Sequence, residues 1–307
     1  MNQESEPLFA GQYKILSEID QTNNSQVYQA IDTFSGNKVA LKLIELTAET
    51  FSMSNTECDL LLDVSHPFII KCQRIFDIGN LRVIVFPLAE GGDLLSLANR
   101  EKPISLHTLI TIMKKCLYGI HYLHSLKILH GDVKPENILL RDMNEADPTP
   151  WITDFGYAVR LCDPKTLNLH HGQINGENVY LSKSSHHYYN DKGEIECCCK
   201  NGTTYYLPPE FYDYQSHSFP LDIYGLGMTF EVLTRNVIEP IPEEIKILIQ
   251  AMTRPNHIFR PNSFLCVQIS NTWGTPESLD FTKSQLKSPN LVINLRGRAK
   301  SAQQQAA

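Results

Sequence analysis

The sequence has no long apolar run, no export signal and no excess of basic residues. No stretch approaches the ~18 apolar residues of a membrane-spanning helix, and the polar, acidic start at residues 1–7 lacks the basic and apolar regions of an export signal. Lys and Arg number 27 against 34 Asp and Glu, a net charge of -7. Proteins that bind phosphate backbones usually carry a basic face, so we expect no nucleic-acid partner. We therefore expect an intracellular, cytoplasmic protein without a membrane span, with the nucleus left open.

Glycine and proline are also modest in number, and the cysteines are not spaced for a zinc site. With 16 Gly, 17 Pro and no sustained heptad, the chain is neither collagen-like nor a coiled coil. Its 8 Cys include no C-x₂-C pair, which disfavours a structural zinc ion. A chain of 307 residues with 42% apolar residues predicts about two packed units with a sizeable core.

Residues 13–86 are predicted to form a small β-rich unit, preceded by an extension at 1–12. Alternating apolar residues at 39–43 are typical of a half-buried strand, and 75–78 with 81–86 predict a hairpin across Gly79-Asn80. Residues 50–64 lack Gly and Pro and favour a helix that ends before Pro67.

Residues 92–270 are predicted to form a larger helical unit, joined to the first by a hinge at 87–91. One apolar stripe indicates a long helix from Leu106 to His124, and Pro220 begins a segment that is apolar on most sides, as in a core helix. Residues 157–201 and 271–307 are polar without a clear period, so we expect loop or disorder in both.

Residues 130–137 (HGDVKPEN) and 154–156 (DFG) carry the strongest chemical signal, together with Lys42 in VALK and Glu57 further on. Asn137 and Asp154 offer the hard oxygen ligands that suit Mg²⁺. A lysine, a carboxylate beside a second lysine, and a metal site are what phosphoryl transfer needs.

These motifs, in this order and at this spacing, resemble those of the eukaryotic protein kinases over residues 13 to 265. The resemblance implies an α+β, bilobal fold with ATP and Mg²⁺ bound between the lobes. It implies that Lys42 pairs with Glu57 and holds phosphates, and that Asp132 orients the substrate hydroxyl. Lys134 would lie near the γ-phosphate, and Asn137 and Asp154 would bind the metal.

The resemblance also implies an adenine site and two structural anchors. Phe86 would guard the back of the pocket. The residues implied around the nucleotide base are Ile19, Val27, Ala40, Pro87, Ala89 and Leu139. Asp222 would hold the catalytic loop, and Arg260 would pair with Glu210. Lys134 together with Thr203 is typical of Ser/Thr kinases and predicts protein substrates with Ser or Thr hydroxyls.

The sequence departs from the family in the phosphate-covering loop, at Gly131 and in the lengths of two segments. The three loop glycines are replaced by Asp20, Thr22 and Ser25, which should weaken nucleotide binding because glycine lets backbone amides approach phosphate. Gly131 stands where most regulated kinases have Arg, so we expect activity that does not depend on activation-loop phosphorylation. The segment before Glu210 is longer than is usual in the family, and the segment before Arg260 is shorter. The surface on which the family docks substrates and regulators therefore cannot be inferred for this chain by analogy.

Two alternatives remain open at this stage. The first is a pseudokinase scaffold that binds nucleotide weakly or not at all, and the second is a small-molecule kinase on the same fold. Intact Lys42, Asp132, Asn137 and Asp154 favour the active protein kinase. The oligomeric state is not determined by the sequence.

Overall fold

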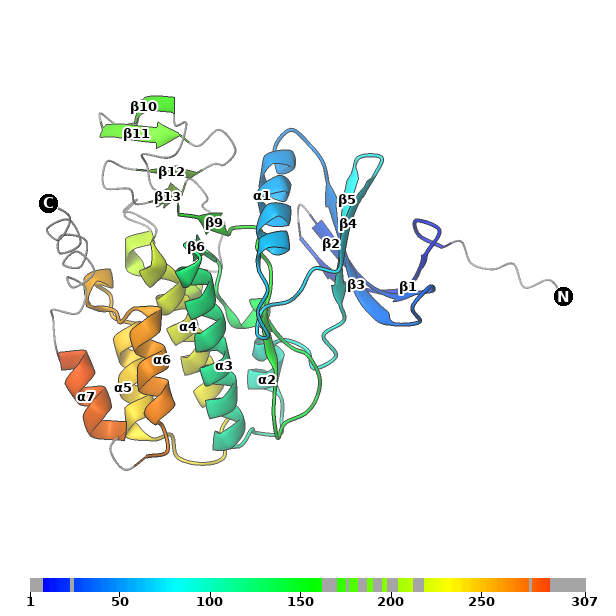
Figure 1. The fold of residues 1–307 in the computed structure, drawn as a ribbon. Helices are drawn as coiled ribbons and strands as arrows, with labels where there is room; N and C mark the ends of the chain where they lie inside the picture. The colour runs from blue at the N-terminus through cyan, green and yellow to red at the C-terminus, as the bar shows by residue number, and fades with distance from the viewer. Residues whose placement is uncertain are drawn as a thin grey trace, which may run out of the picture.

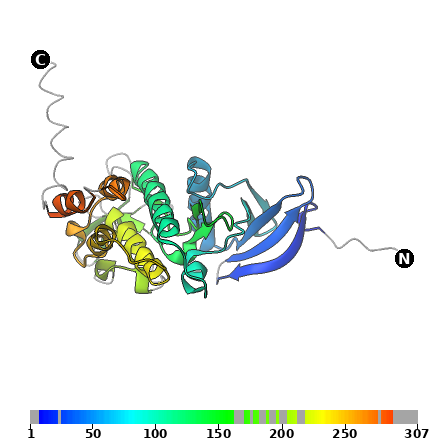
Figure 2. The same cartoon turned by 90° about the horizontal axis from the view of Figure 1, so that it is seen from below.

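The computed structural model describes most of the chain, with gaps in the long segment before Glu210 and at both ends. The described residues are 8–22, 25–161, 170–174, 177–181, 187–189, 195–197, 204–211, 218–275 and 278–287. Among them, no helix is both long and apolar enough to cross a membrane. Figures 1 and 2 show a sheet and a bundle of helices side by side, with one helix, α1, between them.

The first lobe is a five-stranded antiparallel sheet with the order β1-β2-β3-β5-β4. Its strands are β1 (Tyr13–Gln21), β2 (Ser25–Asp32), β3 (Lys38–Glu45), β4 (Arg74–Ile78) and β5 (Leu81–Pro87). Helix α1 (Thr50–Asp63) covers one face, and the predicted helix and hairpin are thereby confirmed. Alternation along β3 buries Val39 and Leu41 in the cluster on the other face and leaves Lys42 on the α1 side.

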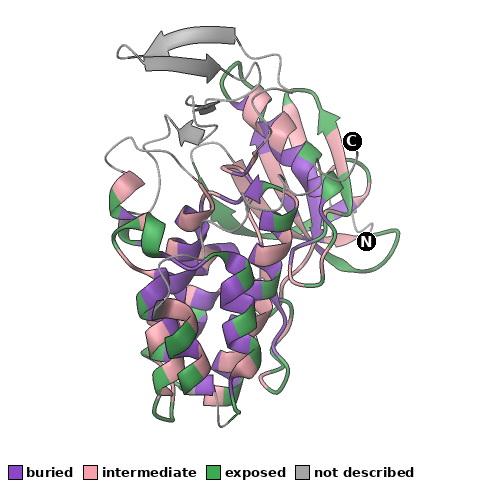
Figure 3. Ribbon diagram, turned by 60° about the vertical axis from the view of Figure 1, so that its left-hand side comes forward, coloured by how far each residue is buried: buried purple, intermediate pink, exposed green. Residues whose placement is uncertain are grey.

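The second lobe is helical. Its helices are α2 (Leu94–Asn99), α3 (Leu106–Ser125), α4 (Phe219–Thr234), α5 (Glu243–Met252), α6 (Ser263–Thr272) and α7 (Ser278–Lys287). The predicted stripe of α3 is buried from Leu109 to Ile120, and α4 is buried on most sides, as expected. Figure 3 shows the buried residues concentrated where the helices face one another. The predicted bilobal α+β fold is therefore confirmed.

Two short antiparallel pairs at the top of the helical lobe carry the central motifs. Strand β6 (Ile128–Leu129) pairs with β9 (Val159–Arg160), and β7 (Ile138–Leu140) pairs with β8 (Pro150–Ile152). The 3₁₀ turn η1 (Pro135–Asn137) joins β6 to β7. Residues 130–137 thus lie between β6 and β7, and residues 154–156 lie between β8 and β9.

The prediction of loop or disorder at 157–201 is wrong for the described part of that segment. Besides β9, it forms a four-stranded sheet of β10 (His170–Ile174), β11 (Glu177–Leu181), β12 (His187–Tyr189) and β13 (Ile195–Cys197). Strands β10 and β11 are separated by Asn175-Gly176, a dipeptide that strongly favours a tight hairpin. Polar composition hid this local turn signal.

The prediction of a disordered tail from residue 271 is also wrong as far as residue 287. Helix α6 continues to Thr272, and α7 packs on the core through Phe281 and Leu286. The hydroxyl of Ser278 donates to Glu244 of α5 at 3.0 Å. Because α7 buries only a narrow side, its sequence is polar overall.

Candidate functional site

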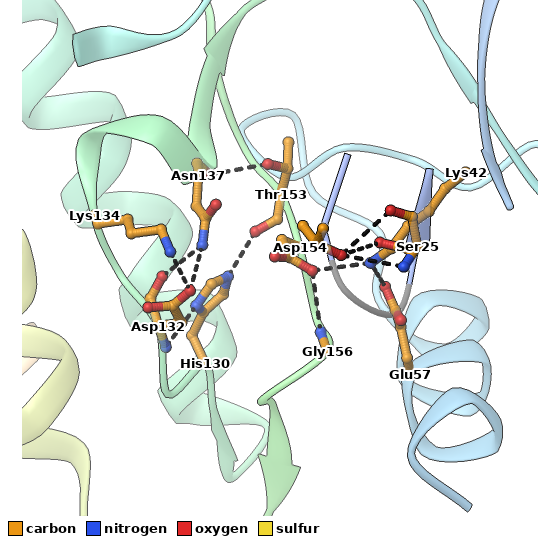
Figure 4. A network of polar contacts seen from close by, with 11 residues as sticks. Ser25, Lys42, Glu57, His130, Asp132, Lys134, Asn137, Thr153, Asp154 and Gly156 are labelled. Carbon is orange, nitrogen blue, oxygen red and sulfur yellow. Dashed lines mark hydrogen bonds and ion pairs between the residues drawn. The ribbon is translucent and has the colours of Figure 1, made fainter. Parts of the chain in front are cut away.

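Lys42 binds two carboxylates, one from α1 in its own lobe and one from the helical lobe. Its ammonium donates to Glu57 of α1 at 2.7 Å and to Asp154 at 2.9 Å (Figure 4). The Lys42 and Glu57 side chains are 14% and 4% exposed, whereas Asp154 is 38% exposed. The more open carboxylate therefore lies where a ligand can reach it.

The surroundings shift the pKa of each of these three groups in a different way. Burial raises the pKa of Glu57, and attraction to Lys42 lowers the pKa of Asp154 to about 2. Burial alone would lower the pKa of Lys42, but the two carboxylates outweigh it and raise the pKa above its usual range. At neutral pH the site thus holds an ammonium next to an ionised Asp154.

Asp132 lies opposite this trio, on the loop between β6 and β7. Its Oδ2 accepts from Lys134 at 2.7 Å and from the Asn137 amide at 2.9 Å, and its carbonyl accepts a second bond from that amide at 2.9 Å. Both side-chain donors bind Oδ2, which leaves Oδ1 as the oxygen that can accept from a substrate hydroxyl. Figure 4 shows the Asp132, Lys134 and Asn137 side chains converging.

Thr153 connects the two halves of the site. Its amide and its hydroxyl both donate to the Asn137 carbonyl, at 2.9 and 3.1 Å. Its own carbonyl binds the His130 ring at 2.8 Å. Because Thr153 directly precedes Asp154, these bonds fix Asp154 relative to Asp132.

Asp154 has a left-handed backbone, with φ of 60°. Such a conformation is costly for a residue with a side chain and persists only where the surroundings enforce it. The next residue, Phe155, is 1% exposed and packs edge-on against His130 at 5.3 Å between ring centroids. Burial of this ring helps to hold the carboxylate toward Lys42.

The loop at residues 130–137 is anchored by Asp222 of α4, as predicted. Asp222 is fully buried and accepts from the amides of His130 and Gly131, each at 2.9 Å. His124 of α3 binds the same carboxylate at 2.9 Å. The sequence placed His124 at the end of the apolar stripe, which gave no sign of this bond to Asp222.

A second predicted anchor, Arg260 with Glu210, is also present. The Arg260 side chain is fully buried and forms a two-pronged ion pair with Glu210, with Nη2 to Oε2 at 2.8 Å. It also donates to three backbone carbonyls of the neighbouring turns. The pair thus fixes the end of the long segment against α4 and α6.

The residues predicted around a nucleotide base lie at the junction of the lobes. Strand pairing sets Val27 opposite Lys42 and Ala40 opposite Phe86, which is 8% exposed. Leu139 of β7 forms a bridge to Asp93, which caps α2 just after the hinge. The remaining predicted residues are Ile19, 51% exposed on β1, and the partly buried Pro87 and Ala89 of the hinge. Thr203 lies outside the described residues.

The loop between β1 and β2 bonds to itself. The Thr22 amide donates to the Ser25 carbonyl at 2.8 Å, the Ser25 amide to the Thr22 hydroxyl at 3.1 Å, and the Gln21 amide to Asp20 at 2.9 Å. These amides are therefore engaged within the chain. Pairing also sets Asp20 opposite Val27, so its side chain shares a sheet face with Lys42.

Sequence reasoning missed one contact between the lobes. Arg160 of β9 donates to Asp63 at the end of α1 at 2.8 Å and to the Leu126 carbonyl at 3.3 Å. No motif marks either side chain, because the pair depends on tertiary packing.

Comparison with known proteins gives a family match over most of the chain. The family model described as "Protein kinase domain" matches residues 13–288. The chain is 26% identical over 236 residues to the probable serine/threonine-protein kinase PknB of Lactococcus lactis, which covers 75% of this chain and 32% of that protein. It is 24% identical over 259 residues to a probable myosin light chain kinase of Dictyostelium discoideum, covering 83% and 72%. It is 27% identical over 204 residues to human ribosomal protein S6 kinase alpha-1, covering 65% and 23%. The chain thus spans about a third of the bacterial relative and about a quarter of the human one.

Proposed function

The chain belongs to the protein kinase family, and from that premise we propose that it is an active ATP-dependent serine/threonine kinase. The observation that carries the proposal is the convergence of Lys42, Asp132, Asn137 and Asp154 at one junction, each oriented by a hydrogen bond or ion pair. Phosphoryl transfer needs mainly positioning and charge neutralisation, and these four groups supply both.

Each group has a role that its contacts support. Lys42, held by Glu57, presents a positive charge to the phosphates. Asp132 accepts the proton of the attacking hydroxyl through Oδ1, while Lys134 occupies Oδ2 and balances its charge. The γ-phosphorus–oxygen bond to the nucleoside diphosphate breaks as the bond to the substrate oxygen forms.

Magnesium fits the oxygens of Asn137 and Asp154. The Asn137 amide nitrogen makes both bonds to Asp132, which orients the side chain so that its carbonyl oxygen can act as a ligand. Asp154 is ionised and partly exposed. Carboxylate and amide oxygens are the ligands that Mg²⁺ prefers, and a bound Mg²⁺ would neutralise phosphate charge.

Specificity for Ser and Thr is supported by Lys134 in the loop at residues 130–137 and by the similarity to a bacterial protein named as a probable serine/threonine-protein kinase. The protein substrates are proposed on the same ground. The intracellular, cytoplasmic location stays a prediction from the sequence.

A scaffold without catalysis, which binds nucleotide weakly or not at all, is the second candidate, and the self-bonded loop favours it. Amides at 21, 22 and 25 are taken up by the chain itself, so this loop offers phosphate fewer donors than a glycine loop. The intact catalytic groups outweigh this loss, because they act on the transferred phosphoryl group.

The deciding experiment is transfer of labelled phosphate to a generic protein substrate. Lys42→Met and Asp132→Asn should each lower kcat/KM by about 100-fold or more. Lys38→Met, on the exposed end of the same strand, and Asp142→Asn, an exposed acid nearby, serve as matched controls and should leave it unchanged.

Two outcomes would reject the enzyme. Transfer that survives both active-site substitutions would come from a contaminant. A wild-type protein that transfers no phosphate and is not stabilised by Mg²⁺–ATP, where a ligand at 100 times its Kd would add about 2.7 kcal/mol, would be the scaffold.

A further inference from the structure

Helix α1 carries Glu57, so its position decides whether Lys42 keeps its partner. Two arginines hold this helix, one near each end. Arg82 of β5 reaches Ser54 at 3.3 Å while it binds Asp77 of β4 in a two-pronged ion pair. This first contact lies within the sheet lobe and therefore fixes only the early turns of α1 to their own sheet.

The second contact crosses to the helical lobe. Arg160 of β9 binds the Asp63 carboxylate at 2.8 Å and the Leu126 carbonyl at 3.3 Å. Leu126 directly follows α3, and β9 pairs with β6 immediately before the catalytic loop. Figure 1 shows α1 beside β9. Arg160 thus links the end of α1 to the part of the chain that carries Asp132.

Asp63 lies at the C-terminal end of α1, where a neighbouring cation is favourable. A carboxylate in the last turn of a helix meets the negative end of the helix dipole, and a nearby cation relieves that repulsion. The Asp63 and Arg160 side chains are 64% and 37% exposed. An exposed pair contributes little to global stability, so its effect is expected in where α1 lies rather than in whether the protein folds.

The backbone at Gly131 leaves no room for a side chain, and therefore for a cationic side chain, at this junction. Gly131 has φ of 83°, and a Cβ there would lie 2.7 Å from the Tyr157 carbonyl oxygen. A side chain at 131 is therefore both strained and crowded. At this junction α1 is linked to β9 by a permanent carboxylate, which needs no added phosphate to attract the arginine.

We propose that Asp63 and Arg160 are positioning residues that hold α1 inward and keep Glu57 on Lys42 without phosphorylation of the segment after β9. The proposal rests on the proposed kinase function, which it deepens by a mode of regulation. Neither residue touches the reacting atoms, and both act through α1.

The test compares Asp63→Asn and Arg160→Gln with Asp59→Asn, which removes an exposed acid from the same helix one turn earlier. Each of the first two should lower kcat/KM by about 3- to 10-fold, with an unchanged melting temperature. The double variant should be no worse than Arg160→Gln alone, because that change already breaks the contact with Asp63. Asp59→Asn, Arg160→Lys and phosphatase-treated wild type should keep full activity.

Amide hydrogen exchange gives a readout that does not need catalysis. Exchange in α1 should be faster in Asp63→Asn and Arg160→Gln than in Asp59→Asn. Wild-type rates of exchange and transfer in both variants, or activity lost on phosphatase treatment, would overturn the proposal. If the wild type transfers no phosphate, the proposed function fails, while the exchange comparison still decides whether the pair positions α1.

Discussion

Asp222→Asn is the change that separates positioning of the catalytic loop from nucleotide binding. The Asp222 carboxylate accepts three bonds, from the His130 amide and His124 on Oδ2 and from the Gly131 amide on Oδ1. An amide side chain has one accepting oxygen and one donating nitrogen. In either orientation, at least one buried backbone N–H then faces another donor.

The cost follows from that count. A buried donor without a partner costs about 1–3 kcal/mol, and bonds that lose their charged acceptor weaken by about 1 kcal/mol. The free energy of unfolding should therefore fall by about 2–4 kcal/mol, a large share of the roughly 5–15 kcal/mol of a typical domain. The melting temperature should fall by roughly 5–15 °C.

The kinetic effect should appear in kcat. Asp132 follows the two anchored amides, so its position relaxes when they lose their acceptor. Lys42 and Glu57 are held by other elements, so KM for ATP should change little. Urea unfolding and steady-state transfer test both expectations, with Glu231→Gln on the exposed side of the same helix as the control.

One result would refute this reasoning. Suppose that the free energies of unfolding of Asp222→Asn and Glu231→Gln differ by less than about 1 kcal/mol, and that Asp222→Asn keeps the wild-type kcat. The three bonds then do not hold the catalytic loop in place.

Glu210→Gln should cost about 3–5 kcal/mol in urea unfolding, because it leaves the fully buried Arg260 side chain without its anionic partner; a loss below about 1 kcal/mol would contradict a buried pair. The neighbouring ammonium lowers the pKa of Asp154 from 3.8 to about 2. The ionised Asp154 therefore stabilises the folded protein, fully above about pH 4 and progressively less as the pH falls toward 2. The fall in unfolding free energy over that window should be shallower in Asp154→Asn, and equal slopes would speak against the shift. Thr22→Gly frees the Ser25 amide and should lower KM for ATP by about 3- to 10-fold with little change in kcat, measured by initial rates over a range of ATP; an unchanged or higher KM would show that the self-bonded loop does not limit binding.

The central site could be predicted because its residues are fixed locally. Asp132 and Asn137 lie on one short loop between two small strands, and Asp154 follows β8, which pairs with β7. Once those strands pair, the three side chains meet with little dependence on the rest of the chain. Lys42 needed one long-range assumption, that β3 faces the loop, and the resemblance of its VALK motif to the protein kinases supplied it.

The rest depended on contacts that leave no local pattern. The pair of Asp63 with Arg160 spans 97 positions, and that of His124 with Asp222 spans 98. Helix α7 has a polar sequence because only a narrow side of it packs on the core, and the segment that holds β10–β13 is rich in polar residues. Composition therefore suggested disorder where pairing or packing gives regular structure.

The residues that depart from the family pattern are not the residues that orient the proposed catalytic groups. The loop at 22–25 and the glycine at 131 concern how nucleotide is covered and how activity is switched, whereas Asp132 and Asp154 are oriented by Asp222, Thr153 and a buried phenyl ring. A weaker cover raises the ATP concentration that the site requires, but it does not displace the groups that act on the γ-phosphate. The arrangement therefore supports the proposed kinase, with reduced affinity for ATP and no need of added phosphate for activity, rather than a protein whose catalytic centre has decayed.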